Sequence, residues 1–473
     1  MTQSLVNLLP SFMPDRSAAT PIFEQICAAF RSRIRSGALA EGARLPATRA
    51  LAQDLGVARA TVVTAYEQLV AEGYLAVRQG SGYVVCAMGE VELPAQASTA
   101  PTPEPMERPV LLLEAGQPDM RLFPHRAWGK CVARLCRTRP QDLLTGCGRL
   151  GHPELRQAIA AHVRDWRGIE ARPEQVLVTS GATEALDICL HALAAPGSTV
   201  GVEDPGYPLI RLFAERQGRQ IRDLLLDPQG AEVPRLDEAT STVVLTPSHQ
   251  FPLGGAMSAG RRQAFVQWAA QRQGWIIEDD YDSEFRYAGR PIPALASVDA
   301  QGRTVYIGSF SKIFSNSLRM GYVVAPEPLV EALRRAMQIR GARASAMPQA
   351  ALAEFMLRGE FYRHLRRVRR LYAERHRLLI ERLRDRFGHL GQVTDHQAGM
   401  QVVLHLPPHL KDSQVAQAAR HAGVGAEALS DYCQSQSTTG KAYNGLVLGA
   451  CLNDLDEQLE AMARLATVIS STE

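Results

Sequence analysis

A proline-rich segment in the first quarter of the sequence limits how this chain can fold. Residues 87–109 read AMGEVELPAQASTAPTPEPMERP, with prolines at positions 94, 101, 103, 105 and 109. Proline fixes the backbone torsion φ and lacks the amide hydrogen that helices and sheets use, so this segment cannot be helical and favours an extended spacer. Because loops of this length are uncommon inside compact domains, we predict a linker between an N-terminal domain over 15–86 and a larger domain over 110–473.

The composition of the 473 residues indicates a globular chain and leaves its activity open. Hydrophobic residues make up 46% and charged residues 21%, which excludes a disordered or fibrous protein. The formal charge of only +3 does not by itself indicate binding to nucleic acid. The sequence contains no apolar run of membrane-spanning length, no secretory signal and no CxxC pair among its eight cysteines. We therefore expect a cytoplasmic protein with reduced thiols, no membrane association and no metal site.

The N-terminal region has the pattern of a helix-turn-helix followed by a hairpin. Apolar residues at helical spacing predict a first helix between Pro21 and Gly37. The segment LPATRALAQDLGVARATVVTAYEQLVAEGYL then contains two apolar faces on either side of a turn at Gly56. These faces consist of Leu51, Ala52 and Leu55, and of Val62, Ala65, Tyr66 and Leu69. The following YLAVRQGSGYVV alternates around Gly80 and Gly82, which predicts a two-stranded hairpin and, with the helices, a winged helix.

This region resembles the DNA-binding domain of the GntR family over about residues 20–86. The resemblance rests on LPATRALA, LGVARATVVTAYEQL, EGYL and RQGSG, in this order. It implies binding to double-stranded operator DNA through Arg44, Arg49, Arg59, Thr61 at the start of the recognition helix, and Gly80 in the wing. Arginine can pair with guanine edges or phosphates, and amides at a helix N-terminus suit phosphate. Seven arginines against five acids give this region a net charge of only +2, so we expect tight binding to need two copies in a dimer.

In the larger domain, polar residues follow a series of predicted strands that alternate with helices. This alternation predicts a mainly parallel sheet that binds its ligand at the carboxyl ends of the strands. Lys312 follows the apolar strand VYIGSF, and burial together with a cation such as Arg319 disfavours its ammonium form, as a Schiff-base lysine requires. Asp279, at the end of another strand, can keep a pyridine nitrogen protonated. The acids after it, Asp280, Asp282 and Glu284, are predicted to be solvated or structural.

These residues, in this order, resemble fold-type I pyridoxal-phosphate aminotransferases over about residues 110–470. The resemblance implies an α/β domain with a large subdomain over about 110–345, a small C-terminal subdomain over about 346–473, and pyridoxal 5′-phosphate as cofactor. It assigns the cofactor's internal aldimine to Lys312, its pyridine nitrogen to Asp279, its phenolic oxygen to Tyr281, ring stacking to Tyr207, and its phosphate to Ser309, Arg319 and the amides of Gly181 and Ala182.

The order of the two domains is more specific than either domain alone. The segments TPSHQFPLGG, IEDDYDSEFRYAGRPIPAL and GSFSKIFSNSLRMGYVV are similar to signature segments of the MocR subfamily of bacterial regulators. This resemblance covers the whole chain and implies a head-to-tail, domain-swapped homodimer, with each winged helix resting on the other subunit's body. It implies a transcriptional regulator that senses an amine, or pyridoxal phosphate itself, through the Lys312 aldimine.

Three departures from the aminotransferase pattern leave turnover open. Phe251-Pro252 stands where enzymes usually have Asn-Pro, and Gly146-Cys147 stands where relatives often have a tyrosine. The strand AYNGLVLGACLN lacks the arginine that binds the substrate's α-carboxylate, which weakens recognition of ordinary amino acids unless Arg211 or Arg343 replaces it. A bifunctional aminotransferase with an accessory DNA-binding domain, and a body that is only a dimerisation scaffold, therefore remain as alternatives.

An arginine-rich segment, FYRHLRRVRRLYAERHRLL, precedes the C-terminal region. Phe361, Leu365, Val368 and Tyr372 fall at helical spacing, with seven arginines on the remaining faces. We predict an amphipathic helix, packed on the small subdomain, whose residues 363–377 carry these arginines. The alternative is that this basic helix contacts DNA beside the operator, since phosphate contacts need only positive charge.

Overall fold

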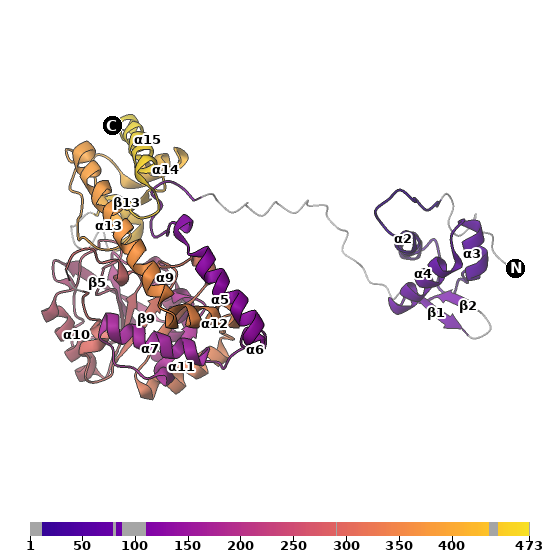
Figure 1. Cartoon of the computed structure of the whole chain (residues 1–473), viewed down its shortest axis with the longest axis horizontal. Coiled ribbons are helices and arrows are strands. Elements are labelled where there is room, and N and C mark those ends of the chain that lie inside the picture. The colour runs from indigo at the N-terminus through magenta and orange to yellow at the C-terminus, as the bar shows by residue number, and fades with distance from the viewer. Residues whose placement is uncertain (1–11, 79–81, 88–109, 290, 435–442, 473) are drawn as a thin grey trace. The chain divides into compact units, whose positions relative to one another are not determined.

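The computed structural model describes residues 12–78, 82–87, 110–289, 291–434 and 443–472. The chain divides into two compact units, Met1–Glu107 and Arg108–Glu473, each with its own hydrophobic core (Figure 1). The break between the units falls inside the proline-rich segment. Apart from Ala87, the predicted linker lies outside the described residues, so its extended conformation stays a prediction.

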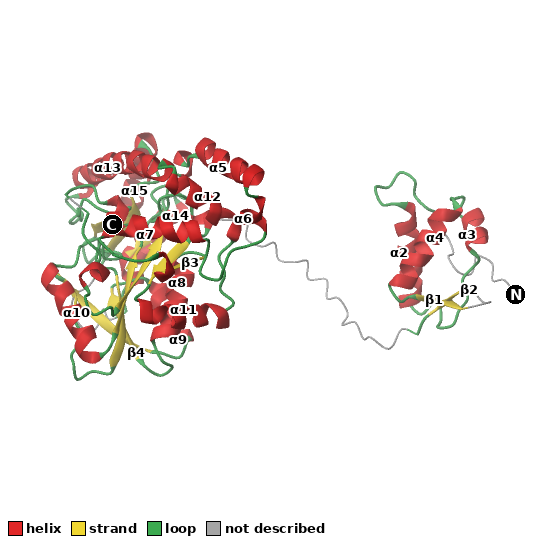
Figure 2. Cartoon of the chain, turned by 60° about the horizontal axis from the view of Figure 1, so that its bottom comes forward, coloured by secondary structure: helices red, strands yellow, loops and turns green. Residues whose placement is uncertain are grey.

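In its described residues, the N-terminal unit contains three helices and a hairpin (Figure 2). Its elements are α2 (Ile22–Arg35), α3 (Thr48–Asp54), α4 (Arg59–Ala71), β1 (Leu75–Arg78) and β2 (Gly82–Val85). The two strands pair antiparallel, and Gly56 makes the turn between α3 and α4 with a φ of +62°. All seven apolar residues predicted for the two helix faces are buried against α2, around a Tyr66 ring that contacts Phe30 and Tyr83 edge-on. The predicted winged helix-turn-helix is confirmed.

The larger unit is built on an eight-stranded sheet in the order β3-β10-β9-β8-β7-β4-β5-β6. The strands are β3 (Val176–Thr179), β4 (Thr199–Asp204), β5 (Gln220–Asp227), β6 (Gly230–Ala231), β7 (Thr240–Leu245), β8 (Trp275–Asp280), β9 (Thr304–Ser309) and β10 (Gly321–Val324). Strands β5, β4, β7, β8 and β9 are parallel, whereas β10 and β6 are antiparallel to their neighbours. The chain from β9 to β10 is too short for a crossover, so β10 must run antiparallel and the sheet is mixed.

Helices cover both faces of this sheet, as an α/β fold requires (Figure 2). Side chains alternate along the strands, so Val244 and Ile277 pack toward α8 (Ala182–Leu193), α9 (Pro208–Arg216) and α11 (Glu327–Ile339). On the other face lie α7 (Pro153–Arg167) and α10 (Ala259–Arg272). Further helices, α5 (His125–Thr138), α6 (Pro140–Leu144) and α12 (Ala346–Leu357), pack against one another, and α12 also packs on α7. In the part of the chain that the structure describes, no helix is both long and apolar enough to span a membrane.

The C-terminal part consists of a small antiparallel sheet and three helices. The long helix α13 (Glu360–Phe387) leads to β11 (Gln401–His405), α14 (Asp412–His421), β12 (Glu427–Ala428), β13 (Gly445–Gly449) and α15 (Leu455–Thr472). Phe361, Leu365, Val368 and Tyr372 are buried along α13, as their spacing predicts. The segment at Leu112 and Leu113 returns to this part, because it pairs with Val424 and bonds to the Asn453 side chain.

Candidate functional site

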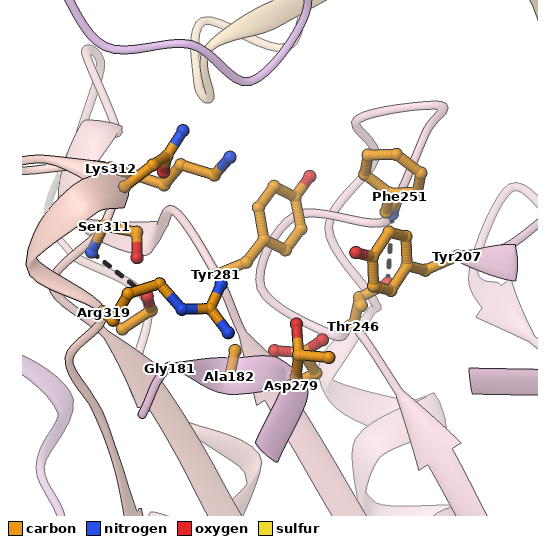
Figure 3. A pocket seen from close by; sticks show the side chains of 13 residues that line it. Gly181, Ala182, Tyr207, Thr246, Phe251, Asp279, Tyr281, Ser311, Lys312 and Arg319 are labelled. Carbon is orange, nitrogen blue, oxygen red and sulfur yellow. Dashed lines mark hydrogen bonds between the residues drawn. The ribbon is translucent and has the colours of Figure 1, made fainter. Parts of the chain in front are cut away.

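A cavity of about 220 Å³ lies at the carboxyl ends of the strands of the large sheet (Figure 3). All eight residues that the sequence assigns to a cofactor line it, namely Gly181, Ala182, Tyr207, Asp279, Tyr281, Ser309, Lys312 and Arg319. Four lining residues were missed, namely Thr183, Thr246, Ser311 and Asn316, whereas Phe251 was noted only as a departure from the aminotransferase pattern. Thr183, Thr246 and Ser311 lie within four residues of a strand's carboxyl end, which is the sequence signal that could have found them.

Lys312 lies in the loop after β9 and points into the cavity. Its Nζ atom donates a hydrogen bond to the carbonyl oxygen of Gly116 at 2.6 Å. Burial lowers the pKa of Lys312, although the carboxylates of Asp282 and Asp279 oppose this effect. The sequence also named Arg319 as a cause, and that contribution stays a prediction, since burial is the largest cause in the structure. The lowered pKa increases the fraction of Lys312 present as the neutral, nucleophilic amine.

Asp279 lies at the end of β8 and contributes a buried oxygen to the cavity. Its side chain is 6% exposed, and its Oδ1 atom has no hydrogen-bond partner among the described residues. Burial, together with Asp280, Glu203 and Asp282, raises the pKa of Asp279 to about 7. A buried oxygen of this kind requires a donor. A ring nitrogen that carries a hydrogen would satisfy Oδ1 and, if positively charged, would stabilise the ionised carboxylate.

Another part of the lining, at the start of α8, is suited to an anion. Helix α8 begins at Ala182, and no side chain caps its first amides. The exposed guanidinium of Arg319 pairs with no carboxylate among the residues that the structure describes, and in Figure 3 it points toward Ala182. The backbone of Arg319 has a φ of +48°, which residues with a Cβ atom rarely adopt. An uncapped helix N-terminus beside an unpaired guanidinium is the arrangement that binds phosphate groups.

Aromatic side chains form one wall of the cavity. Phe251 contacts Tyr207 and Tyr281 edge-on, with ring centroids 5.5 and 5.6 Å apart. Its amide donates to the Thr246 hydroxyl at 3.0 Å, a bond drawn in Figure 3. Phe251 therefore lines the cavity with an apolar ring at the position where the aminotransferase pattern has an asparagine.

The acids after Asp279 are buried, so the prediction that they are solvated is wrong and the structural alternative holds. Asp280 lies 2.7 Å from the Arg167 guanidinium, and Asp282 contacts His249. Arg211 and Arg343 do not line the cavity, since Arg211 pairs with Asp223 and Arg343 donates to the Cys147 carbonyl. Neither therefore replaces the missing arginine in the cavity of its own chain.

The described residues predicted to contact DNA lie in the first turns of α3 and α4 or, in the case of Arg44, shortly before α3. Arg49 lies in the first turn of α3, and Arg59 begins α4 and donates to the Thr48 hydroxyl at 3.3 Å. Arg44, Arg49 and Arg59 are exposed, and Thr61 is half-buried in the first turn of α4. Gly80 lies outside the described residues. No side chain caps the N-terminus of α4, so its amides remain available for a phosphate.

Two family models match the chain in sequence order. The model for bacterial regulatory proteins of the gntR family matches residues 22–85, and the model for aminotransferase class I and II matches residues 108–437. Among solved structures, LysN, an α-aminoadipate aminotransferase from Thermus thermophilus complexed with N-(5′-phosphopyridoxyl)-L-leucine, is 26% identical. It superimposes with a TM-score of 0.68, covering 76% of this chain and 92% of LysN.

Curated relatives share both domains. The probable rhizopine catabolism regulatory protein MocR of Rhizobium meliloti is 36% identical over 444 residues, 88% of each chain. The pyridoxine biosynthesis transcriptional regulator PdxR of Corynebacterium glutamicum is 36% identical over 456 residues, 96% of each chain. This chain therefore belongs to the MocR subfamily of gntR-type regulators, in which a winged helix is joined to an aminotransferase class I and II domain.

Proposed function

We propose that this chain is a transcriptional regulator that binds operator DNA through its winged helix and binds pyridoxal 5′-phosphate in the cavity of its body. The observation that carries the proposal is that one cavity brings together three kinds of polar group. They are the Oδ1 atom of Asp279, which has no partner among the described residues, the anion-binding group of Arg319 and α8, and the Lys312 amine. These groups match the ring nitrogen, the phosphate and the aldehyde of that cofactor. When bound, the cofactor supplies an electrophilic carbon with which amines can combine.

Each lining residue has a separate task toward this cofactor. The Asp279 carboxylate holds a proton at the ring nitrogen, and Arg319, Ser309 and the amides at the start of α8 bind the phosphate. Tyr207 covers a face of the ring, and Phe251 excludes water from its edge. Lys312, with its lowered pKa, provides the amine that holds the cofactor in place.

We propose sensing rather than net transamination as the task of the body. Arg319 is the only guanidinium among the described lining residues, and the phosphate needs it. A substrate α-carboxylate therefore finds no second guanidinium there, which disfavours ordinary amino acids. The effector is an amine or the B6 vitamer itself, and the names of the rhizopine and pyridoxine regulators among the relatives are compatible with either.

A head-to-tail, domain-swapped homodimer is part of this proposal. Exposed apolar side chains on the body support an interface between copies of the chain, namely Leu144, Ile339, Met347 and Leu357. Two winged helices in one dimer would bind two half-sites, which compensates for the small charge of each. Effector binding would then change the spacing of the two winged helices and so the affinity for the operator.

Borohydride reduction tests cofactor binding directly. The purified chain is incubated with pyridoxal phosphate, reduced, digested and analysed by mass spectrometry, and we expect the phosphopyridoxyl mass on Lys312 and on no other lysine. The K312A variant is the control. Absence of the mass from wild type would refute cofactor binding and favour the scaffold alternative.

Electrophoretic shift of the DNA flanking the gene, with and without pyridoxal phosphate, tests regulation. We expect a shifted complex whose affinity depends on the cofactor or an added amine. Repeated turnover of an amine with a keto-acid acceptor would instead establish the bifunctional aminotransferase.

A further inference from the structure

His249, Asp282 and Tyr281 form a hydrogen-bonded group beside the cavity. The Nδ1 atom of His249 lies 3.0 and 3.1 Å from the two carboxylate oxygens of Asp282 and 2.8 Å from the Tyr281 hydroxyl. His249 and Asp282 are 4% and 1% exposed, and neither lines the cavity. Tyr281 does line it (Figure 3). The buried pair therefore makes no direct contact with a ligand in the cavity, and Tyr281 is the lining residue to which it is hydrogen-bonded.

The same nitrogen of His249, Nδ1, contacts both Asp282 and the Tyr281 hydroxyl, and this determines the direction of the Tyr281 hydrogen. A buried carboxylate needs donors, and Asp282 receives the Met400 amide at 3.3 Å besides Nδ1 of His249. A lone pair on Nδ1 would face two carboxylate oxygens, so Nδ1 carries the hydrogen. The Tyr281 oxygen then also faces this N–H and cannot donate to it. The hydrogen of Tyr281 is free to point into the cavity.

Packing holds the imidazole of His249 in this orientation. A Cβ atom on Gly399 would lie only 1.9 Å from Cε1 of His249, and Gly399 has a φ of +79°. The backbone at Gly399 therefore lies against the ring edge in a way that only glycine permits. The carbonyl of the same residue accepts a hydrogen bond from Tyr287 at 2.8 Å. The ring has little freedom to turn Nδ1 away from Asp282.

We propose that His249 and Asp282 are positioning residues that orient Tyr281 as a hydrogen-bond donor toward the cofactor's phenolic oxygen. This inference rests on the proposed binding of pyridoxal phosphate. It explains how the site tolerates Phe251 at the position where the aminotransferase pattern has an asparagine donor. Tyr281 supplies the donor that is lost with that asparagine. The contact with His249, which Asp282 holds in place outside the cavity, determines the direction of the Tyr281 hydrogen.

The tautomer of His249 tests the orientation without any cofactor. In ¹⁵N-histidine-labelled full-length protein free of ligand, we expect the His249 resonances to show hydrogen on Nδ1, with assignment by their loss in H249N. The D282N variant should change the His249 resonances, because it removes the acceptor. A lone pair on Nδ1 in the wild type would overturn the proposal.

A double-mutant cycle tests the link to Tyr281. The dissociation constant of pyridoxal phosphate, measured from its visible absorbance on binding, should rise on the order of tenfold in H249L, which corresponds to one hydrogen bond. H249N should rescue binding, since its amide can donate to Asp282. In a Y281F background the H249L change should have no further effect. H162L is the matched control, because His162 is 1% exposed, lies 3.3 Å from Glu284 and contacts no residue of the lining.

The two proposals fail in different ways. Wild-type protein that does not bind pyridoxal phosphate would refute the proposed function. If wild-type protein binds pyridoxal phosphate and the losses of affinity in H249L and Y281F are additive, only the role of His249 is refuted. An equal loss of affinity in H162L would show a general effect of removing a buried histidine and would also overturn the proposal.

Discussion

The carboxyl group of Asp279 makes the stability of the unliganded chain depend on pH. Its pKa is raised from 3.8 to about 7 by burial and by neighbouring acids. Between these values the folded chain holds a proton that the unfolded chain has lost, so stability falls as pH rises from about 4 to about 7. Each unit of pKa shift is worth about 1.4 kcal/mol, so we expect D279N to be more stable than wild type by about 4 kcal/mol at pH 8 and by about 1.5 kcal/mol at pH 5.

Urea unfolding of the unliganded full-length chain at both pH values measures this difference. Glu203 has a pKa that burial also raises to about 7, and E203Q serves as a comparison for a second buried acid. A D279N advantage that is the same at pH 5 and pH 8 would contradict the assignment of the raised pKa to Asp279.

Arg49 and Arg59 allow a test of DNA contact at single residues. Both are exposed at the helix-turn-helix. We expect R49A and R59A each to weaken operator binding about tenfold or more, and each lost phosphate contact to reduce the salt dependence of log K by about one. Fluorescence anisotropy over a salt series measures both effects. R35A is the control, since Arg35 is exposed in the last turn of α2 and Arg31, one turn before it, pairs with Glu72 at the C-terminal end of α4, the end opposite to Arg59. A loss in R35A as large as in R59A would contradict the prediction.

The sequence located the chemical residues of the cavity better than the residues that support them. Asp279, Ser309 and Lys312 follow apolar strands, and ligands of such sheets bind at strand ends, so local pattern and a known motif were sufficient. Thr246 and Phe251 follow a strand in the same way but carry no distinctive chemistry. The contact of His249 with Asp282 could not be predicted, because it depends on which strands are neighbours and on the packing at Gly399.

At the level of elements, the buried faces of helices could be predicted from the sequence, whereas the direction of strand β10 could not. The spacing of apolar residues located α2, α3, α4 and α13 because it reflects local helix geometry. The antiparallel β10 was missed, since an apolar GYVV reads the same in either direction and only the short chain after β9 decides its orientation. Burial of the acids after β8 also escaped notice, because their partners Arg167 and His249 come from distant segments.

The arginines of α13 differ in their environment, although the sequence placed all seven on its outer faces. Arg375 is 9% exposed and donates to Asp119 at 2.9 Å and to the Cys451 carbonyl at 2.7 Å, so that expectation is wrong for this residue. Arg366 and Arg370 are exposed and have no polar partner in the described part of the chain. Removing one member of a buried ion pair typically costs about 3–5 kcal/mol, whereas exposed charges contribute little.

We therefore expect R375Q to destabilise the body by about 3 kcal/mol and the double variant R366Q/R370Q to change stability by less than about 0.5 kcal/mol. Chemical unfolding of the full-length chain compares the three proteins. The same double variant decides whether the helix touches DNA. An unchanged salt dependence of operator affinity supports an ordinary solvated helix face, and a flatter one would establish phosphate contacts there.

At the level of the whole molecule, the question is how a winged helix with so little positive charge can bind an operator tightly. Its net charge of +2 supports only a few phosphate contacts, so a single copy should bind weakly. Joining two copies makes the second binding event intramolecular and raises the apparent affinity by a factor of about 10²–10⁴ without new contacts. The body would thus contribute to DNA binding by dimerising as well as by sensing.

The exposed apolar residues of α6 and α12 are the candidates for such a dimer interface. Leu144 and Met347 are 76% and 53% exposed on two helices that pack against each other. Charged side chains there should prevent an apolar interface, so we expect L144D/M347D to sediment as a monomer and to bind a two-half-site operator about a hundredfold more weakly than wild type. Leu459 on α15 is 52% exposed, and L459D should remain dimeric and bind normally. On a single half-site, wild type and L144D/M347D should bind alike, because only one winged helix is engaged. A monomeric variant that keeps wild-type affinity for the full operator would show that one winged helix is sufficient.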